Sequence, residues 1–368
     1  MDDKSRNLDK LFITPEWYAN EQRRRIESPR GKLVIASCRS GSYMAKKVVQ
    51  RYTELLQENS SEEDVLYIED IDKQFSDTET GVRLEKHVGG YDIFLFQALS
   101  DPVSGRSVDQ NYMAFLIAAR TFREHGANHI TAMLPYLAYA RQDKPTRYMR
   151  EPTTAKLMAD LSVQAGIDRL VAWHPHSSQI HGFYGATPVN LLSSLSLFIK
   201  EFEEFRNRDD VIAVAPDAGA SKFVTHFGRE LNINSAIASK YRPKPEEVIT
   251  TEIIGNFREK KVAIILDDLI SSAGTIYSLI QKLVKDKEIE QIFLGVSHNL
   301  CSEKALNRLQ ELHDENYLER AVFTNSIPQK KSFRDLPFVD ICCLSDELSR
   351  TINRIHYSSS VSEIFYQA

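Results

Sequence analysis

Short apolar runs alternate with longer runs of mixed polarity along most of the chain. Short uninterrupted apolar runs are typical of strands buried on both faces of a parallel sheet. They predict strands at Leu33–Ser37, Val65–Ile68, Ile93–Leu99, Ile130–Leu134, Leu170–Trp173, Val211–Ala215, Ala236–Ala238, Val262–Leu266, Ile292–Val296 and Ala321–Thr324. The stretches between them predict helices at Ser42–Leu56, Gln110–Glu124, Thr153–Ala165, Leu192–Phe205, Ser221–Leu231, Ile276–Lys285 and Ser302–Leu312.

This alternation predicts an α/β protein with mainly parallel sheets flanked by helices. A chain of 368 residues is long enough for two domains. Gly185 and Pro188 interrupt the pattern, so we expect one domain at residues 31–188 and another at 189–343. The C-terminal segment 344–368 is a candidate for joining the first domain. Residues 1–30 are polar and form an extension whose role the sequence does not reveal.

Composition narrows the classes of function. The formal net charge is −5, and no block of Lys and Arg dominates, so nucleic acid is not expected as a partner. No stretch contains 18 consecutive apolar residues, so no membrane span is expected, and the charged N-terminus has no signal core. The four cysteines show no C-x-x-C spacing and are expected to be reduced core thiols. These features predict a soluble, cytoplasmic protein.

The segment Val262–Thr275, which reads VAIILDDLISSAGT, predicts a sugar-phosphate site. Its apolar strand ends at two adjacent carboxylates, Asp267 and Asp268. A small-residue turn and a helix N-terminus follow, where free backbone N–H groups and the helix dipole favour a phosphate. The carboxylates repel phosphate, but they could hold sugar hydroxyls or a divalent cation. A plain helix N-terminus with serine caps is the alternative. The turn residues are Ser271, Ser272, Ala273, Gly274 and Thr275.

Three other segments make the resemblance to one family specific. Pro135–Lys144 reads PYLAYARQDK, His176–Tyr184 reads HSSQIHGFY, and Val214–Ala220 reads VAPDAGA. Together with the segment Asp267–Thr275, called the DD loop below, and in this order along the chain, they resemble ribose-phosphate pyrophosphokinase (PRPP synthetase). The resemblance runs from about Leu33 onward. The resemblance implies two similar phosphoribosyltransferase-like domains. It also implies a homo-oligomer, either a hexamer or another assembly based on dimers.

The resemblance further implies roles for individual residues. Ribose 5-phosphate would bind at Ser271–Thr275, with its hydroxyls on the Asp267–Asp268 pair. ATP would contact the A-R-Q-D segment and a second segment, FSDTE, in which an aromatic ring stacks on adenine. A surface arginine and a solvated turn are the alternatives for these two segments. The implied ATP-binding residues are Phe75, Asp77, Glu79, Arg141, Gln142 and Asp143.

By the same resemblance, His176 and Asp217 would bind Mg²⁺. One departure concerns His174, which stands where the family usually has Asp. Because Mg²⁺ prefers oxygen ligands, this change could alter cation placement or metal preference. His174, His176 and His181 leave a zinc site open, although the segment has no obvious third soft ligand. Asp217 could instead cap the following helix.

Lys240 and Arg242 are the expected catalytic cations. They are two residues apart in the extended segment SKYRPKP, so both side chains can point the same way. In the family, a K-x-R pair on a mobile loop closes over the phosphates; a solvated charge run is the alternative. A second departure is Ser271, where the family usually has Asp.

The leading hypothesis is an enzyme that transfers the diphosphoryl group of ATP to ribose 5-phosphate. A non-catalytic regulatory homologue of the synthetase is the alternative, motivated by His174 and Ser271. A phosphoribosyltransferase that consumes PRPP would explain the DD loop. It would leave the A-R-Q-D-K and H-S-S-Q segments unexplained.

Overall fold

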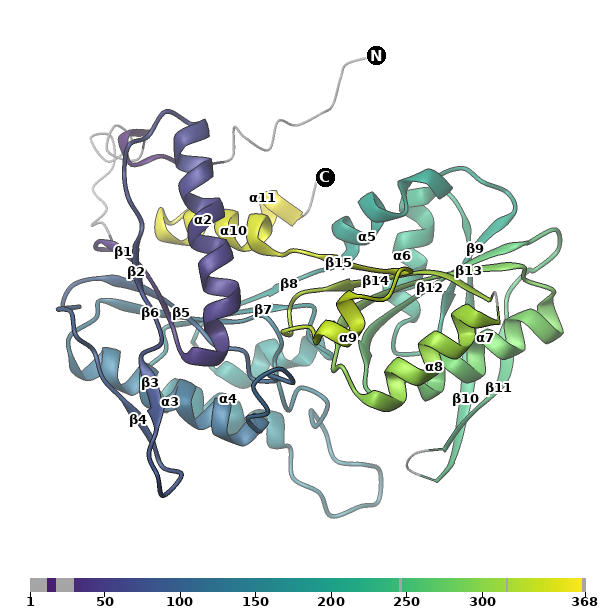
Figure 1. Cartoon of the computed structure of the whole chain (residues 1–368), viewed down its shortest axis with the longest axis horizontal. Coiled ribbons are helices and arrows are strands. Elements are labelled where there is room, and N and C mark those ends of the chain that lie inside the picture. Colours follow the sequence, from purple (N-terminus) through teal and green to yellow (C-terminus); the bar gives the residue numbers. More distant parts are fainter. Residues whose placement is uncertain (1–11, 18–29, 245–246, 316, 366–368) are drawn as a thin grey trace. The chain divides into compact units, whose positions relative to one another are not determined.

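The computed structural model describes residues 12–17, 30–244, 247–315 and 317–365, apart from the side chains of residues 240–251, 363 and 365. The chain divides into two compact units (Figure 1). Unit 1 contains residues 1–192 and 343–368, and unit 2 contains residues 193–342. No helix in the described part of the chain combines the length and apolar character needed to span a bilayer.

Unit 1 is built on a six-stranded sheet in the order β2-β1-β5-β6-β7-β8. Every neighbouring pair in it is parallel, as the continuous apolar runs predict. The strands are β1 (Leu33–Ser37), β2 (Leu66–Ile68), β5 (Asp92–Phe96), β6 (His129–Leu134), β7 (Arg169–Trp173) and β8 (Val189–Leu192). A separate antiparallel hairpin joins β3 (Asp72–Gln74) to β4 (Thr80–Val82). Because β8 pairs with β7, the first unit extends past residue 188, where the sequence placed the boundary.

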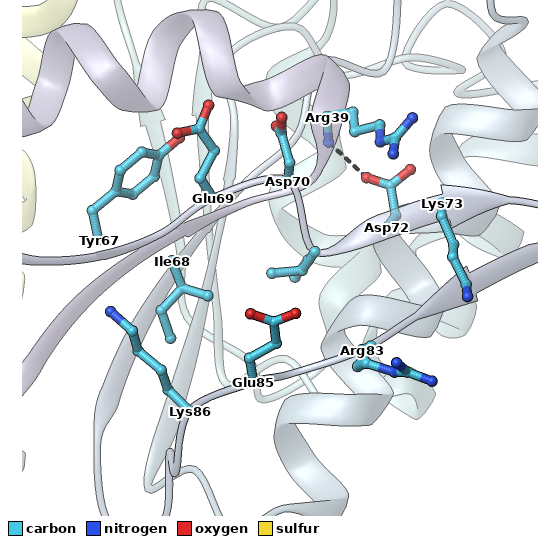
Figure 2. A pocket seen from close by; sticks show the side chains of 11 residues that line it. Arg39, Tyr67, Ile68, Glu69, Asp70, Asp72, Lys73, Arg83, Glu85 and Lys86 are labelled. Carbon is cyan, nitrogen blue, oxygen red and sulfur yellow. Dashed lines mark hydrogen bonds between the residues drawn. The ribbon is translucent and has the colours of Figure 1, made fainter.

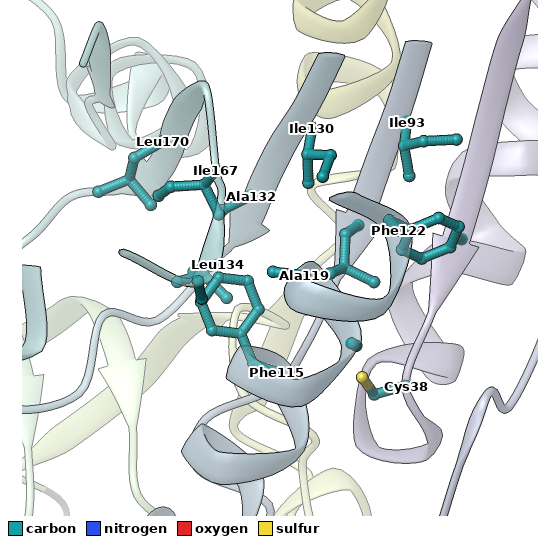
Figure 3. Packing of buried hydrophobic residues seen from close by; sticks show 14 of the residues in the cluster. Cys38, Ile93, Phe115, Ala119, Phe122, Ile130, Ala132, Leu134, Ile167 and Leu170 are labelled. Carbon is teal, nitrogen blue, oxygen red and sulfur yellow. The ribbon is translucent and has the colours of Figure 1, made fainter. Parts of the chain in front are cut away.

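Helices flank this sheet on both faces (Figure 1). They are α2 (Ser42–Glu58), α3 (Val108–Glu124), α4 (Thr154–Ala165), α10 (Ser345–His356) and α11 (Ser362–Phe365), with 3-10 turns η2 (Arg39–Gly41) and η3 (Ser178–Tyr184). Helix α3 begins with a capping box between Ser107 and Gln110. Figure 3 shows Phe115, Ala119 and Phe122 of α3 lying over Ile93 and Ile130 of the sheet. Burial of these apolar faces provides the main drive for assembly.

Residues near the N-terminus and the C-terminal helix α10 both contact α2. The Asn353 side chain accepts a hydrogen bond from the Ile13 N–H (2.7 Å) and donates one to the Ile13 carbonyl (2.6 Å). Phe12 packs edge-on against Tyr52 of α2, with ring centroids 5.4 Å apart. Part of the N-terminal extension, whose role the sequence left open, therefore belongs to the packed structure of unit 1.

A buried carboxylate also ties α10 to the sheet. Asp92, fully buried at the start of β5, accepts two hydrogen bonds from Arg30 (2.9 and 3.0 Å) and one from His356 Nδ1 (2.8 Å). Burial alone would raise the pKa of the Asp92 carboxyl. The hydrogen bonds from His356 and Arg30 outweigh burial and hold this pKa below its usual range.

Unit 2 contains a seven-stranded sheet in the order β11-β10-β9-β12-β13-β14-β15. Its pairings are parallel except that β10 and β11 are antiparallel. The strands are β9 (Val211–Ala215), β10 (Asn234–Lys244), β11 (Glu247–Ile254), β12 (Val262–Ile270), β13 (Gln291–Asn299), β14 (Leu318–Thr324) and β15 (Val339–Cys342). The helices are α5 (Leu195–Glu201), α6 (Ser221–Leu231), α7 (Gly274–Lys287), α8 (Glu303–Asp314) and α9 (Lys331–Arg334), with a 3-10 turn η4 (Glu203–Phe205).

The two sheets share one element of topology. The order β2-β1-β5 in unit 1 matches the order β10-β9-β12 in unit 2. In each sheet the next strand of the large sheet (β2 or β10) pairs on one side of the first central strand (β1 or β9). A later strand (β5 or β12) then pairs on its other side. Such a change of direction makes a topological switch point, the usual ligand position in open parallel sheets. The expectation of two similar α/β domains is confirmed at the level of fold.

Several local expectations are wrong. Residues Leu192–Phe205 are not one helix, because Leu192 closes β8 and α5 ends before the turn η4. Strand β12 does not end at Leu266: it continues to Ile270, because β13 offers a pairing partner as far as Asn299. Helix α7 begins at Gly274, two residues before the predicted start. Of the cysteines, Cys38 and Cys301 are buried, but Cys343 is exposed.

We predict that Asp92→Asn destabilises the fold. The neutral amide leaves the Arg30 guanidinium without its buried counter-charge, so the free energy of unfolding at pH 7 should fall by about 3–5 kcal/mol. Because the folded pKa of Asp92 is lowered, its stabilising contribution is present above pH ~4 and lost as pH falls through that lower value. Urea unfolding at pH 7 and pH 3 measures both effects.

The exposed Asp64→Asn provides the control for this experiment, since it removes the same charge without a buried partner. Its unfolding curve should match that of the wild type at both pH values. Equal stabilities of Asp92→Asn and the wild type at pH 7 would contradict the prediction.

Candidate active site

The DD loop lies at the switch point of unit 2. Strand β12 pairs with β9 only through Ile265 and then continues beside β13 alone. The sheet therefore opens between β9 and β12 just where Asp267 and Asp268 occur. Asp217 follows the end of β9 on the other side of this opening.

Backbone N–H groups orient the carboxylates of this opening. The Asp217 Oδ1 atom accepts hydrogen bonds from the N–H groups of Gly219 (2.8 Å) and Ala220 (3.2 Å). It therefore organises the turn before α6, which begins at Ser221. Asp267 Oδ1 accepts from the Asp268 N–H (2.9 Å). All three aspartates are half-buried.

The charges of these three aspartates act on one another. Burial raises the pKa of Asp267 well above its usual range, and the nearby carboxylates of Asp268 and Asp217 raise it further. This effect of Asp217 on Asp267 indicates that the two ends of the opening are electrostatically coupled. A cation or a set of hydroxyl donors at this position would relieve the repulsion.

The turn between β12 and α7 is shorter than the sequence suggests. Only Ser271, Ser272 and Ala273 lie between the two elements, because Gly274 and Thr275 already belong to the first turn of α7. Ala273 adopts a left-handed conformation (φ 57°, ψ 14°), and its methyl side chain cannot accept a hydrogen bond to cap the helix. The first N–H groups of α7 therefore remain available to an anion.

The N-cap residue of α8 and one side chain within α8 hold this turn by hydrogen bonds. Ser302 donates a hydrogen bond to the Ser271 carbonyl, and Arg308 Nη1 donates to the Ser272 carbonyl (2.7 Å). The sequence patterns did not predict this function for either residue. Ser302 was recognisable as a helix cap, but Arg308 gave no signal, because its contact joins residues 36 positions apart.

In unit 1, the FSDTE segment forms the tip of the β3–β4 hairpin. The Phe75 ring is 47% exposed, and Lys73 Nζ lies 4.8 Å from its centroid. The Glu79 N–H donates to Asp77 Oδ1 (3.1 Å), which fixes the turn. The hairpin thus presents an accessible aromatic ring with acidic residues beside it, a combination suited to stacking on a base.

Two other predicted segments follow neighbouring strands of unit 1. Strands β6 and β7 are parallel partners, so the loop with Arg141, Gln142 and Asp143 and the loop with His176 leave the same edge of the sheet. Arg141, Gln142 and His176 are exposed, and Asp143 is half-buried.

A cavity of about 390 Å³ lies beside the start of α2, and its lining includes no residue of these two loops. Figure 2 shows Glu85, Arg83 and Lys86 on one side and Arg39 with Asp72 near its far end. Its charged lining is balanced: Arg39, Lys73, Arg83 and Lys86 against Glu69, Asp70, Asp72 and Glu85. This balance gives the cavity no preference for a polyphosphate.

Comparisons with known proteins decide the family. A family model described as the N-terminal domain of ribose phosphate pyrophosphokinase matches residues 33–166, and one described as a phosphoribosyl synthetase-associated domain matches residues 212–366. A ribose-phosphate pyrophosphokinase of Clostridium acetobutylicum is 36% identical over 295 residues, which is 80% of this chain and 88% of that protein. The chain belongs to the ribose-phosphate pyrophosphokinase family.

Other relatives agree with this assignment. Ribose-phosphate pyrophosphokinase A of Dictyostelium discoideum is 34% identical over 292 residues, covering 79% of this chain and 88% of that protein. A crystal structure of phosphoribosylpyrophosphate synthetase from Mycobacterium smegmatis superposes with a TM-score of 0.75 at 26% identity. The match covers 89% of this chain and all of that one.

Membership of the pyrophosphokinase family confirms the resemblance stated from the motifs, but the roles of single residues stay predictions. The two residues predicted to bind the metal lie in different units: His176 is in unit 1 and Asp217 is in unit 2. Lys240 and Arg242 lie on β10, where the backbone of Lys240 pairs with Thr250 of β11. Their side chains lie outside the described part of the chain.

We predict that Asp267→Asn makes unit 2 more stable while reducing activity. Because the folded pKa of Asp267 is raised, its ionised form costs stability as pH rises above ~4. Removing this charge at pH 7 should raise the free energy of unfolding by about 1–2 kcal/mol. The amide oxygen can still accept from the Asp268 N–H. Thermal unfolding of the purified variant provides the measurement.

The control is Asp209→Asn in the exposed turn before β9, which changes net charge equally and should leave the melting temperature unchanged. A melting temperature for Asp267→Asn at or below that of the control would show that Asp267 carries no repulsive strain.

Proposed function

We propose that the protein transfers the diphosphoryl group of ATP to the anomeric hydroxyl of ribose 5-phosphate, giving PRPP and AMP. The observation that carries this proposal is the acidic opening at the switch point of unit 2. It sits next to an uncapped helix N-terminus in a chain of the ribose-phosphate pyrophosphokinase family. A sugar monophosphate needs both features: donors for its phosphate and carboxylates for its hydroxyls.

Ribose 5-phosphate would bind with its phosphate on the turn Ser271–Ala273 and the first N–H groups of α7. Thr275 can add a hydroxyl donor. The ring hydroxyls of ribose 5-phosphate would donate to Asp267 and Asp268. The absence of an acidic side chain at Ser271 favours phosphate binding, since it removes one negative charge from the loop.

ATP would bind on unit 1. The exposed ring of Phe75 is suited to stacking on adenine, and Asp77 or Glu79 can accept from its amino group. The Arg141 guanidinium can pair with phosphate oxygens. The Gln142 amide can accept or donate at the ribose or base, and the Asp143 carboxylate can accept there.

We also propose that a divalent cation, Mg²⁺, takes part. Among the described residues, no group of three His, Cys, Asp or Glu side chains is arranged as a ready metal cage. Mg²⁺ commonly takes one or two carboxylates and completes its shell with water and substrate phosphates. Asp217 and the Asp267–Asp268 pair supply oxygen donors of the right kind, and His176 would act from unit 1. When bound, the cation would neutralise charge on the transferring phosphates.

The chain's own contribution to the reaction is mainly positioning and charge. The anomeric hydroxyl would attack the β-phosphorus of ATP in line, and the bond from the β-phosphorus to the oxygen bridging to the α-phosphate would break, releasing AMP. Lys240 and Arg242 would stabilise the negative charge that develops on the transferred group. No side chain becomes covalently attached to substrate in this scheme.

We also propose an oligomeric state and a cellular location. We infer a homo-oligomer, a hexamer or an assembly based on dimers, as the resemblance implies. We place it in the cytoplasm, in keeping with four cysteines that form no disulfide. The names of the relatives, which are those of enzymes, favour the catalytic hypothesis over a regulatory homologue.

We expect the purified protein to release AMP from ATP only when ribose 5-phosphate is present. A coupled assay for AMP, run with Mg²⁺ and separately with Mn²⁺, tests this directly and also measures the metal preference that His174 puts in question. Protein that binds both substrates yet releases no AMP above background would support the regulatory alternative.

Lys240→Ala should lower kcat by a factor of about 10²–10³, because a cation that acts mainly in the transition state is lost. The affinity for ribose 5-phosphate should change less than threefold. Lys222→Ala, on α6 of the same unit, removes an equal charge and should leave kcat near that of the wild type. Normal turnover of Lys240→Ala would remove Lys240 from the mechanism.

A further inference from the structure

Helix α8 contacts two consecutive carbonyl groups of the turn that would receive the sugar phosphate. The Ser302 hydroxyl accepts a hydrogen bond from the Ala305 N–H (3.2 Å), which caps the helix, and donates its own proton to the Ser271 carbonyl. Farther along α8, Arg308 donates to the Ser272 carbonyl at 2.7 Å. One side chain thus holds each carbonyl, one from the N-cap of α8 and one from within the helix.

Holding the carbonyl groups also orients the N–H groups. No described peptide bond is cis, and in a planar trans peptide the C=O and the N–H point in opposite directions. Since the Ser271 and Ser272 carbonyls point toward α8, the N–H groups of Ser272 and Ala273 point away from it. The left-handed Ala273 then turns the chain into α7, so successive N–H groups form a concave set of donors.

The Arg308 guanidinium is itself held in place. It lies 6.0 Å from the centroid of Tyr277 on α7, and the Tyr277 hydroxyl donates to Glu311 of α8 (2.5 Å). The Tyr277 N–H donates to the Ala273 carbonyl (2.8 Å). Arg308 is therefore enclosed between the turn and the first turn of α7. A Cβ added at Gly274 would lie only 3.0 Å from Arg308 Nη1, which shows how close the guanidinium is to the backbone.

We propose that Arg308, assisted by Ser302, is a positioning residue that presents the backbone N–H groups of Ser272 and Ala273 to the 5-phosphate of the substrate. This inference rests on the proposed function. Arg308 contacts the backbone of the turn and acts through it, so it is not a catalytic residue. Its positive charge behind the turn also favours an anion in front of it.

Arg308→Met tests the proposal, because methionine keeps an unbranched stem but removes the donor and the charge. We expect the KM for ribose 5-phosphate to rise at least about tenfold while the KM for ATP stays within twofold. Arg308→Lys restores a positive charge and a single donor, so it should recover part of the loss. Arg334→Met on α9 removes an exposed arginine of the same unit and should behave like the wild type.

The hydroxyl of Ser302 allows a second, independent test. Ser302→Asp can still cap α8 but cannot donate to the Ser271 carbonyl, whereas Ser302→Thr keeps both functions. We expect weaker ribose 5-phosphate binding in the Asp variant and near-normal binding in the Thr variant, at similar melting temperatures. If Arg308→Met fails to fold, this pair together with Arg308→Lys decides the proposal.

Titration calorimetry with ribose 5-phosphate separates this proposal from the proposed function. A wild type that releases no AMP would reject the proposed function, whereas the binding comparison between variants still tests Arg308. Folded Arg308→Met with unchanged affinity for ribose 5-phosphate would overturn the positioning role. So would equal increases in the KM values of both substrates, since a general structural defect would produce that result.

Discussion

The separation of β12 from β9 after Ile265 is the constraint on which the candidate site depends. Inside the paired region, side chains of these strands are apolar and buried. Beyond it, the opened sheet can accommodate Asp267 and Asp268 next to Asp217. This arrangement costs free energy, because the Asp268 and Asp217 carboxylates raise the energy of the ionised form of Asp267. The strand must therefore be held by contacts elsewhere.

Strand β13, together with hydrogen bonds made by polar residues at its end, holds β12 in place. Pairing of β12 with β13 continues to Ile270 opposite Asn299. The Asn299 side chain donates to Gln329 (2.9 Å), and His298 Nδ1 lies 2.7 Å from the Ser326 hydroxyl. These groups are buried, so each hydrogen bond also avoids the cost of leaving a polar group unsatisfied. Unit 2 thus fixes its acidic strand on the side of β13 and leaves it unpaired on the side of β9 beyond Ile265.

Apolar patterning predicted the central strands well, because strands buried on both faces carry an unmistakable run of apolar residues. The bounds of β1 and β9 agree with the prediction to the residue. The hairpin strands β3 and β4 were missed because they are short, polar and lie outside the large sheets. The motifs located the loop at Ser271, but local sequence carries no information on tertiary contacts such as the one from Arg308. For the same reason the coupling between Asp217 and Asp267 appeared only in the structure.

The two switch points share one topology but differ in how their charges are compensated. In unit 1, the start of α2 follows β1 as α6 follows β9 in unit 2. There the carboxylate of Asp72 accepts from the Arg39 N–H (2.6 Å) and from Arg106 Nη1 (2.7 Å), and Ser40 donates to Asn111. The charge at that point is thus compensated within the protein. Among the described side chains of unit 2, the equivalent opening has three aspartates, Asp217, Asp267 and Asp268, so a cation or a polyhydroxyl ligand would lower the electrostatic free energy more there than in unit 1.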